Sequence, residues 1–236
     1  MDWAAAIERE TATLRAAATD LDARVPGCPD WDVAELVRHV GTAHHNAALI
    51  VGQRLERHPT QEQLQPPDGT EPFTWLTEGT VALLDVARAT DPTTPVWTFG
   101  PDRTAEFWFR RMAQETLVHR VDAEQAGDRP SDLDPGLAAD GVAESLEVFV
   151  PLLAGADTGP AGRELLLHAI DVESSWLLTF GTGSVAVAAE HRQGDACVQG
   201  PAADLLLWLW GRVPSEALTL DGDPALPDRL QRICRV

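Results

Sequence analysis

One uninterrupted stretch of the sequence, Ala105 to Ala126, constrains the fold more than any other. It contains neither Pro nor Gly, and good helix formers alternate with apolar residues at helical spacing, so it predicts a long helix. Residues three or four positions apart share one face of a helix. One such face starts apolar but turns acidic and polar in its middle. Its members are Trp108, Met112, Glu115, His119, Asp122 and Ala126.

The polar middle of this face predicts a metal site. An unpaired buried charge is costly, so charged groups on a core-facing stripe must be paired or must hold something. Glu115 and His119 stand four residues apart, a spacing that lets two side chains converge on one metal ion. Asp122, one turn further on, either orients His119 or positions a substrate. The alternative for Asp122 is a surface ion pair with a neighbouring Arg.

A second helix supplies the candidate for a third ligand. It is predicted to begin at Asp32, in a capping box with Glu35, and to run to about Arg57. His44 is in phase with its apolar residues, whereas His45 is rotated by about 100° and His39 lies about 140° from His44. The phase therefore predicts His44 as the ligand that reaches the bundle interior. The alternative is that His44 is a hydrogen-bonded core histidine.

The remaining patterns predict an α+β protein with two domains, residues 1–128 and 134–236. Four helices, at residues 1–21, 32–57, 73–89 and 105–126, form a bundle in the first domain. Trp97 and Phe99, in the loop before the last of them, are either a substrate wall or a packing lid. Beyond a Pro- and Gly-rich linker at residues 127–136, a helix and short β-rich runs predict a small, mainly antiparallel sheet with further helices.

Charge and cysteine usage exclude several classes of function. The formal net charge is −19 and the sequence contains no Lys, which argues against nucleic acid or an anionic membrane as a partner. We see neither a signal peptide nor an apolar run long enough to span a membrane. Three scattered cysteines fit neither a disulfide framework nor a thiolate zinc site. We therefore expect a cytoplasmic protein, and interpret Cys28 as a packing residue rather than a reactive thiol.

Two histidines and one carboxylate would leave a tetrahedral metal ion, zinc or another divalent ion, with an open position. A zinc ion of this kind can hold a water molecule and lower its pKa, or hold a thiol and deprotonate it. The first property would suit a metal-dependent hydrolase, which is an alternative function, with Asp122 or Glu124 as the general base. Besides these two kinds of enzyme, the chain could be a non-catalytic module that binds a metal or a small ligand.

Two motifs together resemble the mycothiol-dependent maleylpyruvate isomerase family. They are CPDWDVAELVRHVGTAHH, residues 28–45, and ETLVHRVDAEQAG, residues 115–127. The resemblance implies a DinB-like four-helix bundle, with His44, Glu115 and His119 as metal ligands. The segments GPAADLLLWLWGR, residues 200–212, and LDGDPALPDRL, residues 220–230, resemble the C-terminal domain of that family, which is similar to sterol carrier proteins.

The resemblance also implies a mechanism. The family's zinc binds the thiol of mycothiol, and the resulting thiolate adds to an unsaturated acid such as maleylpyruvate. Rotation about the former double bond and expulsion of the thiol then give the trans isomer. Activation is needed because a free thiol, with a pKa of about 8.5, is mostly protonated at neutral pH. The expected function is thus cis–trans isomerisation, or S-transfer to an electrophilic small molecule, with zinc and mycothiol as cofactors.

The family also uses an arginine from its C-terminal domain, and Arg212 is the matching candidate here. Its guanidinium would bind a carboxylate of the substrate or of the cofactor. The alternative is that Arg212 stabilises the C-terminal end of a helix, where a cation is favoured.

Overall fold

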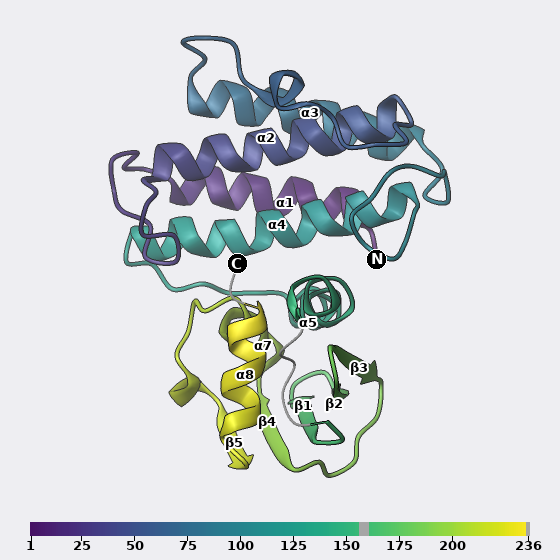
Figure 1. The fold of residues 1–236 in the computed structure, drawn as a ribbon. Coiled ribbons are helices and arrows are strands. Elements are labelled where there is room, and N and C mark those ends of the chain that lie inside the picture. Colours follow the sequence, from purple (N-terminus) through teal and green to yellow (C-terminus); the bar gives the residue numbers. More distant parts are fainter. Residues whose placement is uncertain (156–160, 235–236) are drawn as a thin grey trace. The chain divides into compact units, whose positions relative to one another are not determined.

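The computed structural model describes residues 1–155 and 161–234. The chain forms two compact units, Met1–Ser131 and Asp132–Val236. The first unit is helical, and the second combines helices with a five-stranded sheet (Figure 1). The expected α+β class is therefore confirmed. None of the helices among the described residues has the length and apolar character needed to cross a membrane.

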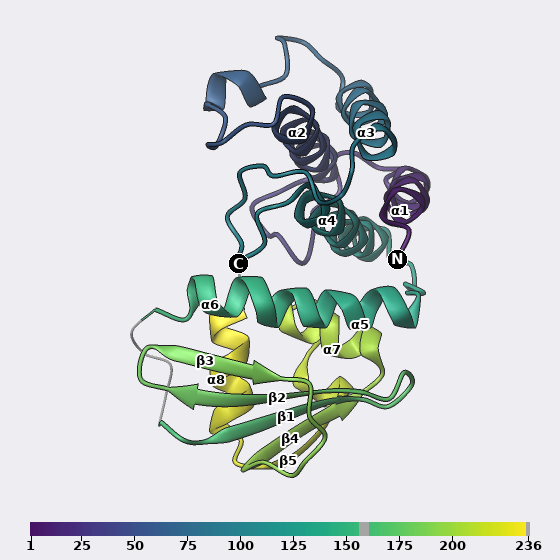
Figure 2. The same ribbon diagram turned by 90° about the vertical axis from the view of Figure 1, so that its right-hand side faces the viewer.

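The first unit is built from four helices, which Figure 2 shows nearly end on. Helices α1 and α2 each pack beside both α3 and α4. Apolar residues of α2, among them Leu36 and Val40, form a core with Leu14 of α1 and Leu76 of α3. The bounds are α1 (Trp3–Ala17), α2 (Val33–Gly52), α3 (Pro72–Ala89) and α4 (Ala105–Ala126).

Local signals account for the two ends of α2. The predicted capping box is present: Asp32 Oδ1 accepts a hydrogen bond from the Glu35 amide at 2.8 Å, and Glu35 Oε2 accepts one from the Asp32 amide at 2.9 Å. The helix ends before the expected Arg57, because Arg54 adopts a left-handed conformation, with φ of 50°. The Leu55 amide then donates to the Ile50 carbonyl, which closes the helix in a Schellman motif.

The second unit starts with a helical segment and continues into the sheet. The strand order is β3-β2-β1-β4-β5, and every neighbouring pair is antiparallel except β1 and β4. The mainly antiparallel sheet is thus confirmed. The elements are α5 (Pro135–Glu144), a π-helical turn η2 (Ser145–Phe149), α6 (Val150–Leu153), β1 (Glu164–Ala169), β2 (Ser174–Gly181), β3 (Ser184–Ala188), β4 (Ala196–Gly200), α7 (Ala202–Leu209), β5 (Thr219–Gly222) and α8 (Ala225–Cys234).

Candidate metal centre

Helix α4 is buried on almost every side, although it carries many charged side chains. Ion pairs compensate for that burial in two separate clusters. In one of them, Arg120 Nε lies 2.9 Å from Glu10 Oε2 of α1, and Arg120 Nη1 lies 2.8 Å from Glu124 Oε2. This cluster ties α4 to α1 and occupies Glu124, one of the two alternative general bases. The other cluster faces α2.

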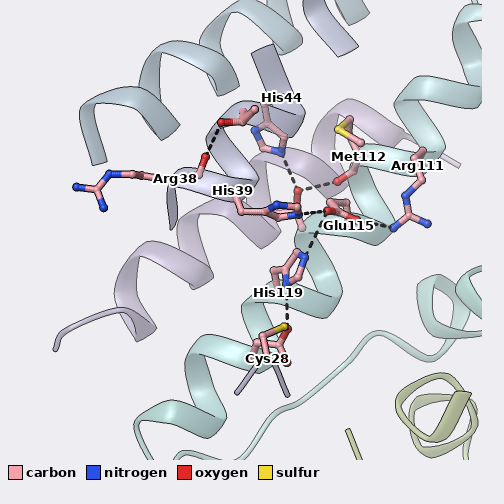
Figure 3. Close-up of polar contacts among 11 residues, drawn as sticks. Cys28, Arg38, His39, His44, Arg111, Met112, Glu115 and His119 are labelled. Atoms are coloured by element: carbon pink, nitrogen blue, oxygen red, sulfur yellow. Dashed lines mark hydrogen bonds and ion pairs between the residues drawn. The ribbon is translucent and has the colours of Figure 1, made fainter. Parts of the chain in front are cut away.

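The cluster that faces α2 joins one carboxylate to two imidazoles (Figure 3). Glu115 Oε1 lies 2.8 Å from His39 Nε2 and 3.3 Å from His119 Nε2. Each of the three residues offers one ligand atom, and these atoms all lie within 4.8 Å of one another. Two imidazole nitrogens and a carboxylate oxygen form one of the donor sets found in catalytic zinc sites. His39, Glu115 and His119 therefore fit a divalent metal ion.

Exposure within this group increases from α4 towards α2. The side chain of His119 is 6% exposed and that of Glu115 15%, whereas that of His39 is 39% exposed. The Trp31 indole lies just before α2, with its ring centroid 4.6 Å from that of His39 and 5.9 Å from that of His119. The group is thus closed on the α4 side and accessible beside His39, as a site that admits a substrate must be.

Asp122 contacts the ring nitrogen of His119 that faces away from Glu115. It is fully buried and its Oδ2 lies 2.9 Å from His119 Nδ1, so that the other ring nitrogen of His119 faces Glu115. The surface ion pair considered for Asp122 is therefore wrong. Cys28 Sγ lies 4.0 Å from the same Asp122 oxygen, and Cys28 also packs against the core cluster of the first unit. Cys28, His119 and Asp122 form a second group with metal-ligand spacing.

A buried arginine holds the other side of the Glu115 carboxylate. Arg111 Nη2 lies 3.1 Å from Glu115 Oε2, and the Arg111 side chain is only 3% exposed. The two oxygens of Glu115 thus have different partners: Oε1 faces the two imidazoles and Oε2 faces the guanidinium. Sequence reasoning did not single out Arg111, although its i, i+4 spacing from Glu115 is a recognisable signal for such a pair.

The pKa values of the two α4 residues reflect this environment. Burial alone would raise the pKa of Glu115, but His119, His39 and Arg111 outweigh it and hold the pKa well below its ordinary value. Burial would lower the pKa of His119, but Glu115 and Asp122 raise it to about 9. In the absence of a metal, a proton on His119 therefore balances the two carboxylates together with the Arg111 guanidinium.

The structure does not bring His44 into this group. Its side chain is fully buried, with Nδ1 3.0 Å from Thr80 Oγ1 and Nε2 2.8 Å from Thr116 Oγ1. Burial lowers the pKa of His44 to about 4, so it is neutral at physiological pH. Both ring nitrogens already have hydroxyl partners, so His44 corresponds to the alternative, a hydrogen-bonded core histidine. His39 takes the place expected for His44.

Helical phase missed His39 because it selects the most deeply buried histidine. A ligand that a substrate must reach lies instead at the edge of the apolar stripe, where one side remains open. His39 stands three residues after the buried Leu36, so it borders the stripe while remaining partly exposed. That edge position is the signal that could have identified it.

Trp97 and Phe99 lie outside this group, in the loop before α4. Trp97 packs against Trp108 with ring centroids 5.9 Å apart, and its carbonyl accepts a hydrogen bond from the Trp108 indole. Phe99 packs edge-on against Phe107 and Trp108. These contacts favour the packing lid over the substrate wall.

Arg212 lies just beyond α7 in the second unit. The Arg212 amide donates to the Leu207 carbonyl at 2.7 Å, and Gly211 before it has φ of 70°, so α7 ends in a Schellman motif. The Arg212 guanidinium donates to the Trp210 carbonyl at 2.6 Å. These contacts fit the helix-end alternative, and the role of Arg212 in binding a carboxylate stays a prediction.

Comparison with known proteins extends over both units. A family model described as the mycothiol maleylpyruvate isomerase N-terminal domain matches residues 3–124, and one described as the MDMPI C-terminal domain matches residues 136–229. A crystal structure of the mycothiol-dependent maleylpyruvate isomerase is similar, with 18% identity and a TM-score of 0.64 over 93% of this chain and 92% of that chain. The structure of its histidine-to-alanine mutant matches with 17% identity, the same TM-score and the same coverage. No curated protein matches the sequence significantly.

Proposed function

The chain belongs to the mycothiol maleylpyruvate isomerase family, a family of enzymes, and we propose that it activates a low-molecular-weight thiol at a metal ion held by His39, Glu115 and His119. The observation that carries this proposal is the position of Glu115 Oε1 between the Nε2 atoms of the two histidines. We propose zinc as the metal and mycothiol as the thiol. The proposed reaction is cis–trans isomerisation of an unsaturated acid such as maleylpyruvate, or S-transfer to a related electrophile.

The charges around the group suit a metal ion and an anionic thiol together. Glu115 and Asp122 carry two negative charges and Arg111 carries one positive charge, so the group has a net charge of −1 when both histidines are neutral. A divalent ion would bring the net charge to +1, and one thiolate would then neutralise it. When bound, zinc supplies a Lewis acid that lowers the pKa of a thiol into the neutral range.

The chain's own residues would bind and orient the reactants. Asp122 holds the His119 ring through Nδ1, which keeps Nε2 directed at the site. Trp31 packs against both imidazoles and would exclude water from one side. Exposure beside His39 leaves a path for the thiol. We assign to Arg212 the binding of a carboxylate of the substrate or of the cofactor, as the sequence resemblance predicts.

Metal content and thiol binding, measured together, test the proposal. Elemental analysis of the purified protein should give about one zinc per chain, and calorimetry should show mycothiol binding to the zinc-loaded protein only. The protein should then convert maleylpyruvate to its trans isomer when zinc and mycothiol are both present. Zinc-loaded protein that binds no mycothiol would contradict the thiol role. Turnover of an ester or amide without any thiol would favour the hydrolase instead.

A further inference from the structure

The two oxygens of Glu115 have different partners, and these contacts restrict how the carboxylate can be oriented. Oε1 lies between His39 Nε2 and His119 Nε2, at 2.8 and 3.3 Å. Oε2 lies 3.1 Å from the Arg111 guanidinium, which is one turn back on the same helix. A carboxylate can bind a metal through one oxygen or through both. Which of these occurs depends on how the carboxylate group is oriented relative to the metal ion. Here one oxygen is already engaged by a buried cation.

We propose that Arg111 is a positioning residue that fixes Glu115, so that Oε1 alone is presented to a metal ion beside His39 and His119. This inference rests on the proposed function, since it concerns the same metal site. Arg111 does not itself face the ion: its guanidinium acts through Glu115. With Arg111 in place, the Glu115 carboxylate would offer a metal ion a single oxygen, Oε1.

The burial of Arg111 makes this role specific to an arginine. Its side chain is 3% exposed, so the pair with Glu115 is little screened by solvent. Guanidinium is a planar donor that matches a carboxylate edge, whereas ammonium is a compact, more strongly hydrated point charge. A lysine at position 111 would retain the charge but would hold Glu115 less firmly. A methionine would remove both the charge and the hydrogen bond while filling a similar volume.

The same helix provides a matched control. Arg120 is also buried and also pairs with a glutamate four residues on, Glu124, but its other partner is Glu10 of α1. Replacing Arg120 therefore removes a buried arginine from α4 and affects stability without touching the Glu115 carboxylate. The comparison separates a positioning role from a general effect on packing.

The experiment uses zinc and Co²⁺ as probes of the full-length protein. Zinc affinity, measured by competition with a chelator, should weaken by about 10- to 100-fold in Arg111→Met, the range typical for residues that orient metal ligands. The zinc affinity of Arg111→Lys should lie between those of Arg111→Met and the wild type. The visible Co²⁺ spectrum of Arg111→Met should lose intensity, because a released carboxylate can bind through both oxygens and raise the coordination number. Arg120→Met should keep the wild-type affinity and spectrum.

Several results would overturn the inference. A wild-type zinc affinity and Co²⁺ spectrum in folded Arg111→Met would contradict the positioning role. If Arg111→Met does not fold, Arg111→Lys takes its place in the same measurements. Equal losses in the Arg111 and Arg120 variants would assign the effect to packing. Failure of the wild-type protein to bind zinc would instead refute the proposed function, and the inference with it.

Discussion

His39 Nε2 lies 2.8 Å from Glu115 Oε1, and this contact joins the first half of α2 to the middle of α4. Five residues further along α2, His44 lies in the interior between two threonine hydroxyls. One helix thus carries two histidines with different roles. His39 is half-exposed beside a carboxylate, whereas His44 is buried and neutral.

This difference predicts opposite effects of two substitutions on metal binding. His39→Ala should abolish stoichiometric zinc binding, because it removes one of three ligands. His44→Gln should retain about one zinc per chain, since an amide can still hydrogen-bond Thr80 and Thr116. Elemental analysis of both purified variants measures the outcome. Loss of zinc from the His44 variant but not from the His39 variant would restore the ligand set predicted from helical phase.

Asp122→Asn should weaken zinc binding without removing it. The asparagine has nearly the same shape but no charge, so its hold on the His119 ring weakens, and losses of about 10- to 100-fold are typical for such partners. Chelator competition gives the affinity, and chemical denaturation gives the stability of the same samples. An unchanged zinc affinity with lower stability would mean that Asp122 only supports the fold.

The stability of the zinc-free protein should depend on pH through His119. The pKa of His119 is raised from 6.5 to about 9, so its contribution is fully present below pH 6.5 and is lost as the pH rises through about 9. The shift corresponds to on the order of 3 kcal/mol. The difference in unfolding free energy between the wild type and His119→Gln, measured from pH 6 to pH 10, should decrease by that order.

Saturating zinc should reverse this trend in the wild type. Zinc binds only the deprotonated imidazole, so the stabilisation that it provides should increase with pH over the same range. A pH-independent difference between the zinc-free wild type and His119→Gln would show that His119 is not charged in the absence of metal.

Arg212 offers a test that separates its two possible roles. If it binds a substrate carboxylate, Arg212→Met should lower kcat/KM by about 10- to 100-fold, the range for a lost charged hydrogen bond, while zinc content stays unchanged. Arg232→Met, which removes a cation from the last turn of α8, serves as the control and should leave kcat/KM unaltered. Reduced stability with unchanged kinetics in Arg212→Met would leave only the helix-end role.

The elements could be predicted largely because local signals specify them. The bounds of α4 were predicted as observed, and the capping box of Asp32 and Glu35 marked the start of α2. The end of α2 was missed because Arg54 terminates it in a conformation for which Arg has no special preference. The composition of the site depends on how α2 and α4 pack, and spacing within one helix does not contain that information.

The two charged clusters of α4 have a consequence for variation of the chain. Glu115, His119 and Asp122 face α2 and Cys28, while Arg120 and Glu124 engage Glu10 of α1. An insertion or deletion of one residue between Glu115 and His119 would rotate Glu115 by about 100° relative to His119, Asp122 and the Arg120–Glu124 pair. Charges on one side would then be buried without partners, at a large cost. Between Glu115 and His119, variation of α4 is therefore confined to substitutions.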